Sequence, residues 1–245
     1  MSKFESVSLV IPAVAEREVR DVVEAVVSGC DTKDIKEFLI VIGDRSDAAY
    51  EDFLETLRRE TAAAPVRILR QPGRGLGDAV HFGIMNAAGS HTVILGADME
   101  NDPADIAYMV SRAKERPDTV ITASRRLKKG CFSDYPRLKR FLNDLFCLGL
   151  KILFRSKQTD ITYAYQIAPT AVLQSLHFAP EASYNNLMLD IGLLPELTGS
   201  PFEEFPSVVG RRKSGKSNVS LKYYVRLIGG VIRLFFRNIK HRGAS

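Results

Sequence analysis

The chain has 245 residues, of which 45% are hydrophobic and 26% are charged, and its formal net charge is +5. This composition excludes extensive disorder, and the length favours one α/β domain over two. No apolar run of about 18 residues predicts a transmembrane helix, and no signal-peptide pattern is expected at the start. The three cysteines are scattered, which favours reduced thiols over a disulfide framework or a zinc site.

The first half of the chain alternates short apolar runs with amphipathic segments. The spacing predicts strands at 8–12, 37–42, 66–69, 91–95 and 118–122, and helices at 16–28, 48–61, 78–88 and 105–116. Such alternation indicates parallel pairing through right-handed crossovers, and therefore an open, doubly wound α/β sheet. These sheets bind ligands beyond the carboxyl ends of their strands. Polar loops follow those ends at 12–16, 43–46 and 98–102, where we expect a nucleotide site.

The second half is less regular. It predicts a long apolar helix at 137–154, a short polar and aromatic segment at 159–165, and a basic stretch after Pro206. From Arg211 to Arg242 there are ten Lys or Arg residues and no Asp or Glu. At helical spacing the following basic residues form one stripe, opposite a broad apolar face: Lys222, Arg226, Arg233, Arg237 and Lys240. This pattern is typical of a helix lying in a membrane interface. Packing on the domain or on another subunit is the alternative.

Two motifs carry candidate chemistry. Asp98 and Glu100 follow the fourth predicted strand, where two carboxylates can bind Mg²⁺ or Mn²⁺ and thereby a diphosphate. Capping of the next helix is the alternative for this pair. The glycine-rich turn at 72–77 brings bare backbone to a helix start, where N–H groups can face an anion. It lacks the dinucleotide-binding fingerprint, and an ordinary tight turn would also explain it.

Taken in order, the motifs resemble those of family 2 glycosyltransferases, in particular the dolichyl-phosphate mannosyltransferase branch. Seven blocks carry the resemblance: SLVIPA at 8–13 with Glu16, VIGDRS at 41–46, RGLG at 74–77, GADMENDP at 96–103, ASR at 123–125, TDIT at 159–162 and RKSGKS at 212–217. The resemblance implies a GT-A domain, which we expect over residues 1–218, followed by a basic amphipathic tail at 219–245. It also implies inverting transfer of a sugar from a UDP- or GDP-linked donor to a dolichyl or undecaprenyl phosphate.

The resemblance assigns roles by position. The residues implied to hold the base and ribose are Pro12, Ala13, Glu16 and Asp44, with Gly75 and Gly77 forming the adjacent wall. Those implied to act on the reacting groups are Asp98 and Glu100 for metal and donor phosphates, and Arg125 and Arg212, supported by Ser217, for the acceptor phosphate. A phosphate acceptor is already anionic, so positioning and charge neutralisation suffice without a strong general base. The planar fork of arginine suits that task.

The departures from the family pattern fall mainly on the donor side. Ala15 replaces an Asn, and Gly43 and Gly96 each replace an Asp. Gln166 replaces a common Arg and Ala164 a Gly, whereas the other acceptor-side blocks keep their pattern. Donor identity and metal dependence are therefore the least defined features.

Alternative functions stay open at this point. One is a glycosyltransferase with a glycan or small-molecule acceptor, and another is a degenerate member that binds a nucleotide without turnover. A nucleotidyltransferase would need a glycine-rich basic loop after the first strand, which 12–16 is not. We expect no nucleic acid partner, and a cytoplasmic protein on the inner face of the membrane, either as a homo-oligomer or with a membrane subunit.

Overall fold

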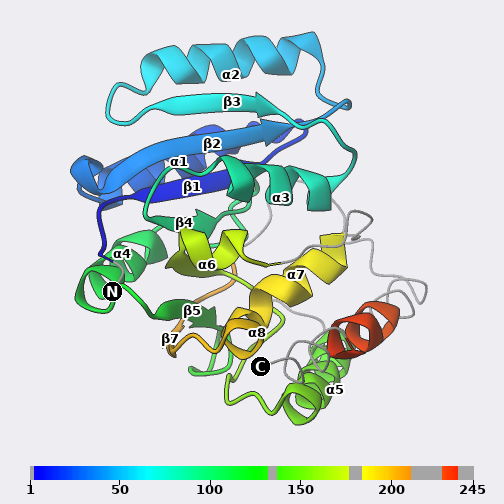
Figure 1. Ribbon diagram of the computed structural model, residues 1–245. Coiled ribbons are helices and arrows are strands. Elements are labelled where there is room, and N and C mark those ends of the chain that lie inside the picture. Colours follow the sequence, from blue (N-terminus) through cyan, green and yellow to red (C-terminus); the bar gives the residue numbers. More distant parts are fainter. Residues whose placement is uncertain (1–2, 132–136, 177–183, 211–227, 237–245) are drawn as a thin grey trace.

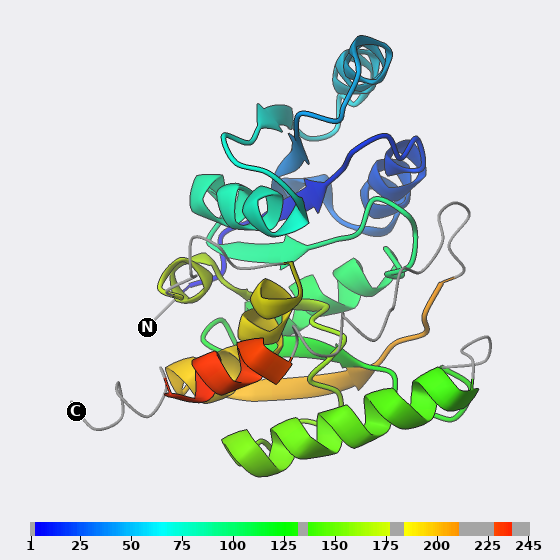
Figure 2. The same cartoon turned by 90° about the vertical axis from the view of Figure 1, so that its right-hand side faces the viewer.

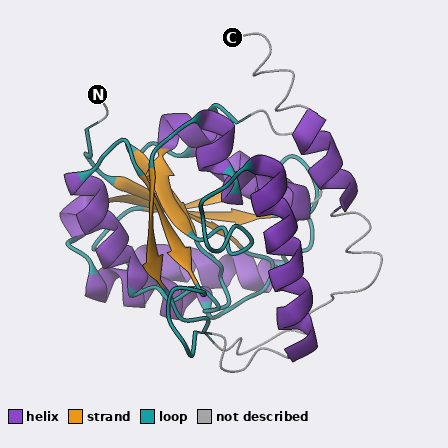
Figure 3. Ribbon diagram, turned by 90° about the horizontal axis from the view of Figure 1, so that it is seen from below, coloured by secondary structure: helices purple, strands orange, loops and turns teal. Residues whose placement is uncertain are grey.

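The computed structural model describes residues 3–131, 137–176, 184–210 and 228–236. In these residues seven strands form one sheet, in the order β3-β2-β1-β4-β6-β5-β7. Helices flank it on both sides (Figures 1 and 3). The strands are β1 (Val7–Pro12), β2 (Ile35–Ile42), β3 (Val66–Arg70), β4 (His91–Ile94), β5 (Val120–Ser124), β6 (Gln166–Pro169) and β7 (Phe202–Pro206).

Two apolar cores lie on the two faces of the sheet. Alternate residues of a strand point to opposite faces, so Leu9 and Ile11 enter one core and Val10 enters the other. Helices α1 (Val19–Gly29), α2 (Ala48–Glu60) and α4 (Asp105–Glu115) contribute to the first core. The second core contains residues of α3 (Leu76–Asn86), α6 (Thr170–Gln174), α7 (Tyr184–Gly192) and α8 (Leu194–Thr198). A short 3-10 helix, Thr32–Asp34, precedes β2.

The doubly wound arrangement expected from the first half of the chain is confirmed. Strands β3, β2, β1 and β4 are parallel neighbours, and each predicted element is present with its ends moved by a few residues. The spacing that indicated the first helix corresponds to a buried stripe on α1, made by Val19, Val22, Val23 and Val26. The long helix α5 (Arg137–Phe154) has the bounds that the sequence predicts.

The other end of the sheet differs from a purely parallel series. Strand β6 lies antiparallel between β4 and β5, and β7 runs parallel to β5 on its outer side. The described strands other than β6 therefore share one carboxyl-end edge. Because β6 runs the opposite way, the segment 159–165 that precedes it returns to this same edge. The candidate site is assembled there.

A third apolar cluster lies where α5, α7 and the helical segment 228–236 meet. Cys147, Leu150 and Phe154 of α5 pack there with Val231 and Leu234. Figures 1 and 2 show this last segment beside α5.

The described part of the tail therefore packs partly on the protein, while Ile228, Ile232 and Phe236 stay exposed. Of the predicted basic stripe, Lys222, Arg226, Arg237 and Lys240 lie outside the described residues, as does the expected domain boundary at 218. No helix within the described ranges is long and apolar enough to cross a bilayer.

Candidate functional site

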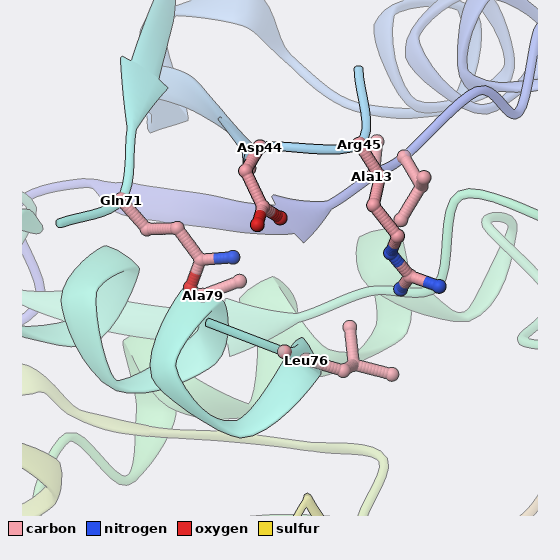
Figure 4. Close-up of a pocket in the computed structure, with 9 residues that line it drawn as sticks. Ala13, Asp44, Arg45, Gln71, Leu76 and Ala79 are labelled. Atoms are coloured by element: carbon pink, nitrogen blue, oxygen red, sulfur yellow. The ribbon is translucent and has the colours of Figure 1, made fainter. Parts of the chain in front are cut away.

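A pocket opens at the carboxyl ends of β1, β2 and β3, above the start of α3 (Figure 4). It is lined by Ala13, Val14, Gly43, Asp44, Arg45, Gln71, Gly75, Leu76 and Ala79. Three of the residues predicted from the sequence, Ala13, Asp44 and Gly75, therefore come together. Gly75 precedes α3 at a φ of 87°, which strains any residue with a Cβ, so the backbone itself forms this wall.

Asp44 and Gln71 bring polar groups into this pocket from neighbouring strand ends (Figure 4). The Asp44 carboxylate is 57% exposed and lies 3.4 Å from the Arg74 guanidinium, so its charge is screened by solvent. Gln71 follows β3 directly, and its backbone N–H donates to the carbonyl of Ile42 at the end of β2. Its side-chain Oε1 is buried and has no hydrogen-bond partner among the described residues.

The other residues predicted for the base and ribose do not line this pocket. Pro12 is the last residue of β1 and is paired with Val41. The Glu16 carboxylate accepts hydrogen bonds from the backbone N–H groups of Val14 and Ala15, at 2.6 and 3.0 Å, and so shapes the loop after β1. Gly77 is buried in the first turn of α3. These residues support the walls of the pocket.

The predicted metal-binding turn follows β4. The Asp98 carboxylate accepts from the Glu100 backbone N–H at 3.2 Å, and Met99 between them has a φ of 61°. Such a conformation is costly for methionine and is maintained only where its surroundings impose it. Gly210 supplies part of that constraint: its N–H donates to the Glu100 carbonyl at 2.9 Å, and a Cβ on Gly210 would lie 2.1 Å from the Met99 carbonyl.

At Gly96, where the family pattern has a third carboxylate, neighbouring side chains leave little room for a side chain. The Gly96 N–H donates to the Asn101 side chain at 3.0 Å, and a Cβ at Gly96 would lie 2.9 Å from an Asp98 carboxylate oxygen. No group of three or more His, Cys, Asp or Glu side chains suited to a metal occurs in the described residues. Asp98 and Glu100 provide hard oxygen ligands, which fit Mg²⁺ or Mn²⁺ only if substrate phosphates complete the shell.

Arg125, predicted to receive a phosphate, is buried at the end of β5. Its guanidinium donates to both carboxylate oxygens of Asp160, at 2.7 and 2.9 Å, and to the Thr162 hydroxyl at 2.9 Å. Its charge also lies over the Tyr163 ring, 4.6 Å from the centroid. These contacts fix the orientation of the arginine. The arginine is not a solvated surface ion pair, because its side chain is 8% exposed and that of Asp160 is fully buried.

A second arginine shares the same carboxylate. Arg126 forms an ion pair with Asp160 and another with the partly exposed Asp144 on α5, at 2.8 Å. Burial alone would raise the pKa of Asp160, but hydrogen bonds and positive charge from Arg125, with the charge of Arg126, hold that pKa below its usual range. Two guanidinium groups thus surround one ionised buried carboxylate.

The loop after β4 is joined by polar contacts to the loop after β7 and to the segment before β6. The Ser207 hydroxyl donates to the Asp105 carboxylate at 2.6 Å, and the Tyr165 hydroxyl donates to the Asp102 carbonyl at 2.7 Å. Burial raises the pKa of Asp105 to about 6, which the hydrogen bond from Ser207 opposes and the charge of Asp102 reinforces. Burial likewise raises the pKa of Tyr163 to about 12.

Some of the site was not predicted from the sequence. Gln71 was missed, although it directly follows a predicted strand. The other pocket loops were chosen because they follow strand ends in the same way. Arg126 lies one residue after a matched block and gave no separate signal. Arg212 and Ser217 lie outside the described residues, and the chain reaches residue 210 beside the Asp98–Glu100 turn.

Comparison with known proteins yields a family match and several curated relatives. A family model described as Glycosyl transferase family 2 matches residues 8–176, more than half of the chain. The undecaprenyl-phosphate 4-deoxy-4-formamido-L-arabinose transferase of Shewanella sediminis is 26% identical over 134 residues, 54% of this chain and 40% of that protein. The same transferase of Proteus mirabilis is 29% identical over 136 residues, 54% of this chain and 42% of that protein. The chain thus spans less than half the length of these relatives.

Solved structures give a likeness in fold. Glucosyl-3-phosphoglycerate synthase from Mycobacterium tuberculosis, in complex with Mg²⁺ and uridine diphosphate, superposes with a TM-score of 0.68 at 15% identity. The superposition covers 94% of this chain and 79% of that one. Mannosyl-3-phosphoglycerate synthase from Rubrobacter xylanophilus superposes with a TM-score of 0.66 at 17% identity, covering 98% and 75%.

Proposed function

The chain belongs to glycosyl transferase family 2, and from this membership we propose that it transfers a sugar from a nucleotide-diphosphate donor to a polyprenyl phosphate. The likeness to solved structures shows that its fold is GT-A. One observation carries the proposal: an open pocket lies at the same carboxyl-end edge of the sheet as two arginines, the buried Arg125 and the partly buried Arg126, which share one buried carboxylate. The names of the curated relatives support the lipid-phosphate acceptor.

The proposed donor is a UDP-linked sugar. Two structures of the Mycobacterium tuberculosis synthase, which has the same fold, contain uridine diphosphate, one of them with Mg²⁺. Asp44 and the bare backbone at Gly75 suit a ribose and the start of a diphosphate, because a carboxylate accepts from hydroxyls and open N–H groups face an anion. Asp98 and Glu100 would hold a divalent cation, which neutralises the diphosphate leaving group.

The proposed acceptor site is built around Arg125 and Arg126. Asp160 fixes both side chains before any substrate arrives, so positive charge is preorganised where a phosphate must be neutralised. Arg212 and Ser217, two and seven residues after Gly210 in the sequence, are proposed to complete this site. An ionised phosphate oxygen is itself the nucleophile, so no protein base has to remove a proton.

We also place the protein on a membrane, at its cytoplasmic face, as the lipid acceptor requires. The exposed face of α5 carries Phe141, Leu145, Leu148 and Ile152, and the adjoining segment 228–236 exposes Ile228, Ile232 and Phe236. Exposed basic side chains border this surface at Arg140, Arg155, Lys157 and Arg233. An apolar surface with basic neighbours is suited to anionic lipid headgroups above acyl chains. The rest of the basic tail at 219–245 is proposed to add to the same contact.

The acceptor assignment is tested with Arg212→Ala in the full chain. Transfer to undecaprenyl phosphate should fall by roughly 100-fold, the usual effect of losing one preorganised charge. Binding of UDP, measured by calorimetry, should change by less than about threefold. A loss of UDP binding equal to the loss of transfer would assign Arg212 to the donor. If wild type transferred sugar equally well to a water-soluble acceptor, a glycan or small-molecule acceptor would be favoured instead. A wild type that binds no nucleotide would contradict the proposed transfer altogether.

The membrane surface is tested with Phe141→Asp/Ile152→Asp. Flotation with vesicles of phosphatidylglycerol should fall at least about fivefold, because both charges would have to enter the interface. Met85→Asp is the control. Met85 is also exposed, at 50%, but it lies on α3 and not on the proposed membrane surface. Equal flotation of both variants would exclude this face.

A further inference from the structure

The turn at 98–100 has a backbone conformation that its own sequence does not favour. Met99 has a φ of 61°, in the left-handed region where residues with a Cβ are uncommon. The Glu100 N–H donates to the Asp98 carboxylate at 3.2 Å, so this conformation also determines where that carboxylate lies. Contacts from outside the turn must therefore hold it in place.

One such contact comes from the segment after β7, residues 207–210, which we call the bridging segment. The Gly210 N–H donates to the Glu100 carbonyl at 2.9 Å. The two backbones approach so closely that a Cβ on Gly210 would lie 2.1 Å from the Met99 carbonyl oxygen and 3.4 Å from that of Glu100. The shorter separation is far inside van der Waals contact. Any residue other than glycine at 210 would therefore displace either the turn or the bridging segment.

The other end of the bridging segment is attached to β5 and its loop. The Ser207 N–H donates to the carbonyl of Ser124, the residue immediately before Arg125, at 3.1 Å. Further along, the Val209 N–H donates to the Cys131 carbonyl at 3.4 Å. The bridging segment thus connects the strand that leads into the proposed acceptor site with the turn proposed to bind the metal.

We propose that Gly210 is a positioning residue for the cation: its contact with the turn holds the Asp98 and Glu100 carboxylates where a divalent ion can meet both. The inference rests on the proposed function, because it assumes that these carboxylates bind a cation together with the donor phosphates. The described residues offer no group of three acidic, His or Cys side chains suited to a metal. With only two carboxylates, the orientation of each one matters more to the affinity.

The test is calorimetric titration of Mn²⁺ into the full chain saturated with UDP. Gly210→Ala should weaken Mn²⁺ binding by about tenfold, the usual effect of losing a group that orients a metal ligand. Binding of UDP without metal should not change, because the pocket at β1, β2 and β3 is untouched. Gly29→Ala is the matched control, since a Cβ there would meet nothing within 4 Å, and it should bind Mn²⁺ as wild type does.

A second pair of variants decides the question if Gly210→Ala does not fold. Met99→Gly adopts a φ of 61° without strain and gives the turn freedom to move away from an added methyl group. The double variant Met99→Gly/Gly210→Ala should therefore fold, and should bind Mn²⁺ about tenfold more weakly than Met99→Gly alone.

The outcomes separate this inference from the proposed function. Equal Mn²⁺ affinity within either pair would overturn the role of Gly210 while leaving the proposed donor intact. A loss of metal-free UDP binding as large as the loss of Mn²⁺ binding would show a general structural role, and would also overturn it. A wild type that binds UDP but no Mn²⁺ would overturn the metal role of the turn and this inference with it. One that binds no UDP would contradict the proposed donor.

Discussion

The two halves of the sheet hold their polar groups in opposite ways. Around the donor pocket, at β3-β2-β1, the side chains of Asp44 and Arg74 are more than half exposed and form an ion pair at 3.4 Å. Around β5-β6-β7, Arg125 and Asp160 are nearly fully buried and are tied by several hydrogen bonds. In the first region the exposed Asp44 side chain contributes little to the structure, whereas the second region uses its functional side chains as part of its structure.

This contrast fits two of the departures from the family pattern, although Ala164 and Gln166 depart from it on the acceptor side. Gly43 and Gly96, the two positions that lack an expected Asp, both lie in strand-end loops on the donor side. Neighbouring side chains, Gln71 and Asn101, occupy the space beside them. On the acceptor side, Asp160 and Arg125 can each be replaced only at the cost of an unpaired buried charge. Binding specificity and fold stability should therefore respond to mutation separately in the two regions.

The largest expected effect is that of Asp160→Ala. It leaves Arg125 and Arg126 without their shared buried carboxylate, and should lower the free energy of unfolding by about 3–5 kcal/mol. Asp144→Ala is the matched control, because Asp144 also pairs with Arg126 but is 45% exposed. In that variant the free energy of unfolding should fall by less than about 1 kcal/mol. Urea unfolding of both variants measures the difference, and equal losses would contradict the contrast.

Next in size is Asp98→Asn, which removes one proposed metal ligand. Transfer should fall roughly 100-fold, since less charge is neutralised on the leaving diphosphate. In the wild type, Mn²⁺ should bind weakly to the free protein and more tightly once UDP is present. The affinity for UDP should rise by the same factor when Mn²⁺ is present. Asp102→Asn makes the same charge change in the same loop and should stay within about threefold in activity. Equal activity of wild type and Asp98→Asn would exclude a metal role for this turn.

A smaller effect is expected for Asp44→Ala. UDP binding should weaken by about tenfold if the carboxylate accepts from ribose hydroxyls, as measured by calorimetry. The unfolding free energy should change by less than about 0.5 kcal/mol, because the carboxylate is exposed. A stability loss above about 1 kcal/mol without a change in UDP affinity would reverse the proposed division between the regions.

The smallest effect concerns pH and Asp105. Its pKa of about 6 in the folded protein exceeds the ordinary 3.8, so the folded state binds the proton more tightly. The stabilisation from this group is full below about pH 4 and is lost as the pH rises through 6. The unfolding free energy of wild type relative to Asp105→Asn should thus fall by an amount on the order of 1 kcal/mol from pH 4 to 7. Thermal melts of both proteins across that range test it, and parallel curves would contradict it.

The fold of the donor half could be predicted because its strands and helices alternate in a regular pattern. Strands β1 and β2 are compact apolar runs, and each is followed by a helix with a regular buried stripe. Beyond β4, the strand β5 gave such a signal, but β6 and β7 did not. Strand β7 contains Glu203 and Glu204, which are compatible with it only because Arg112, 91 residues away, and Thr159, 45 residues away, bind them. Such contacts leave no periodic pattern in the sequence.

The candidate site follows the same division. Ala13, Asp44 and Gly75 meet as expected because parallel strand ends share an edge. The engagement of Arg125 by Asp160 depends on β6 running antiparallel, which returns residue 160 to that edge. A four-residue strand such as Gln166–Pro169 cannot be distinguished from other buried segments by its pattern. The sequence therefore predicted Arg125 as an acceptor-side residue without indicating how its side chain is held.

The pairing of β5 also sets the order in which the chain can fold as it is synthesised. Strands β1 to β4 can pair as soon as residue 94 has left the ribosome. Strand β5, at 120–124, has neither neighbour until β6 at 166–169 and β7 at 202–206 have been made. Through that interval an apolar strand presents two unpaired edges, the condition in which nascent chains aggregate and chaperones bind. Translation pauses placed between β5 and β7 should thus lower the yield of folded protein more than pauses placed before β4.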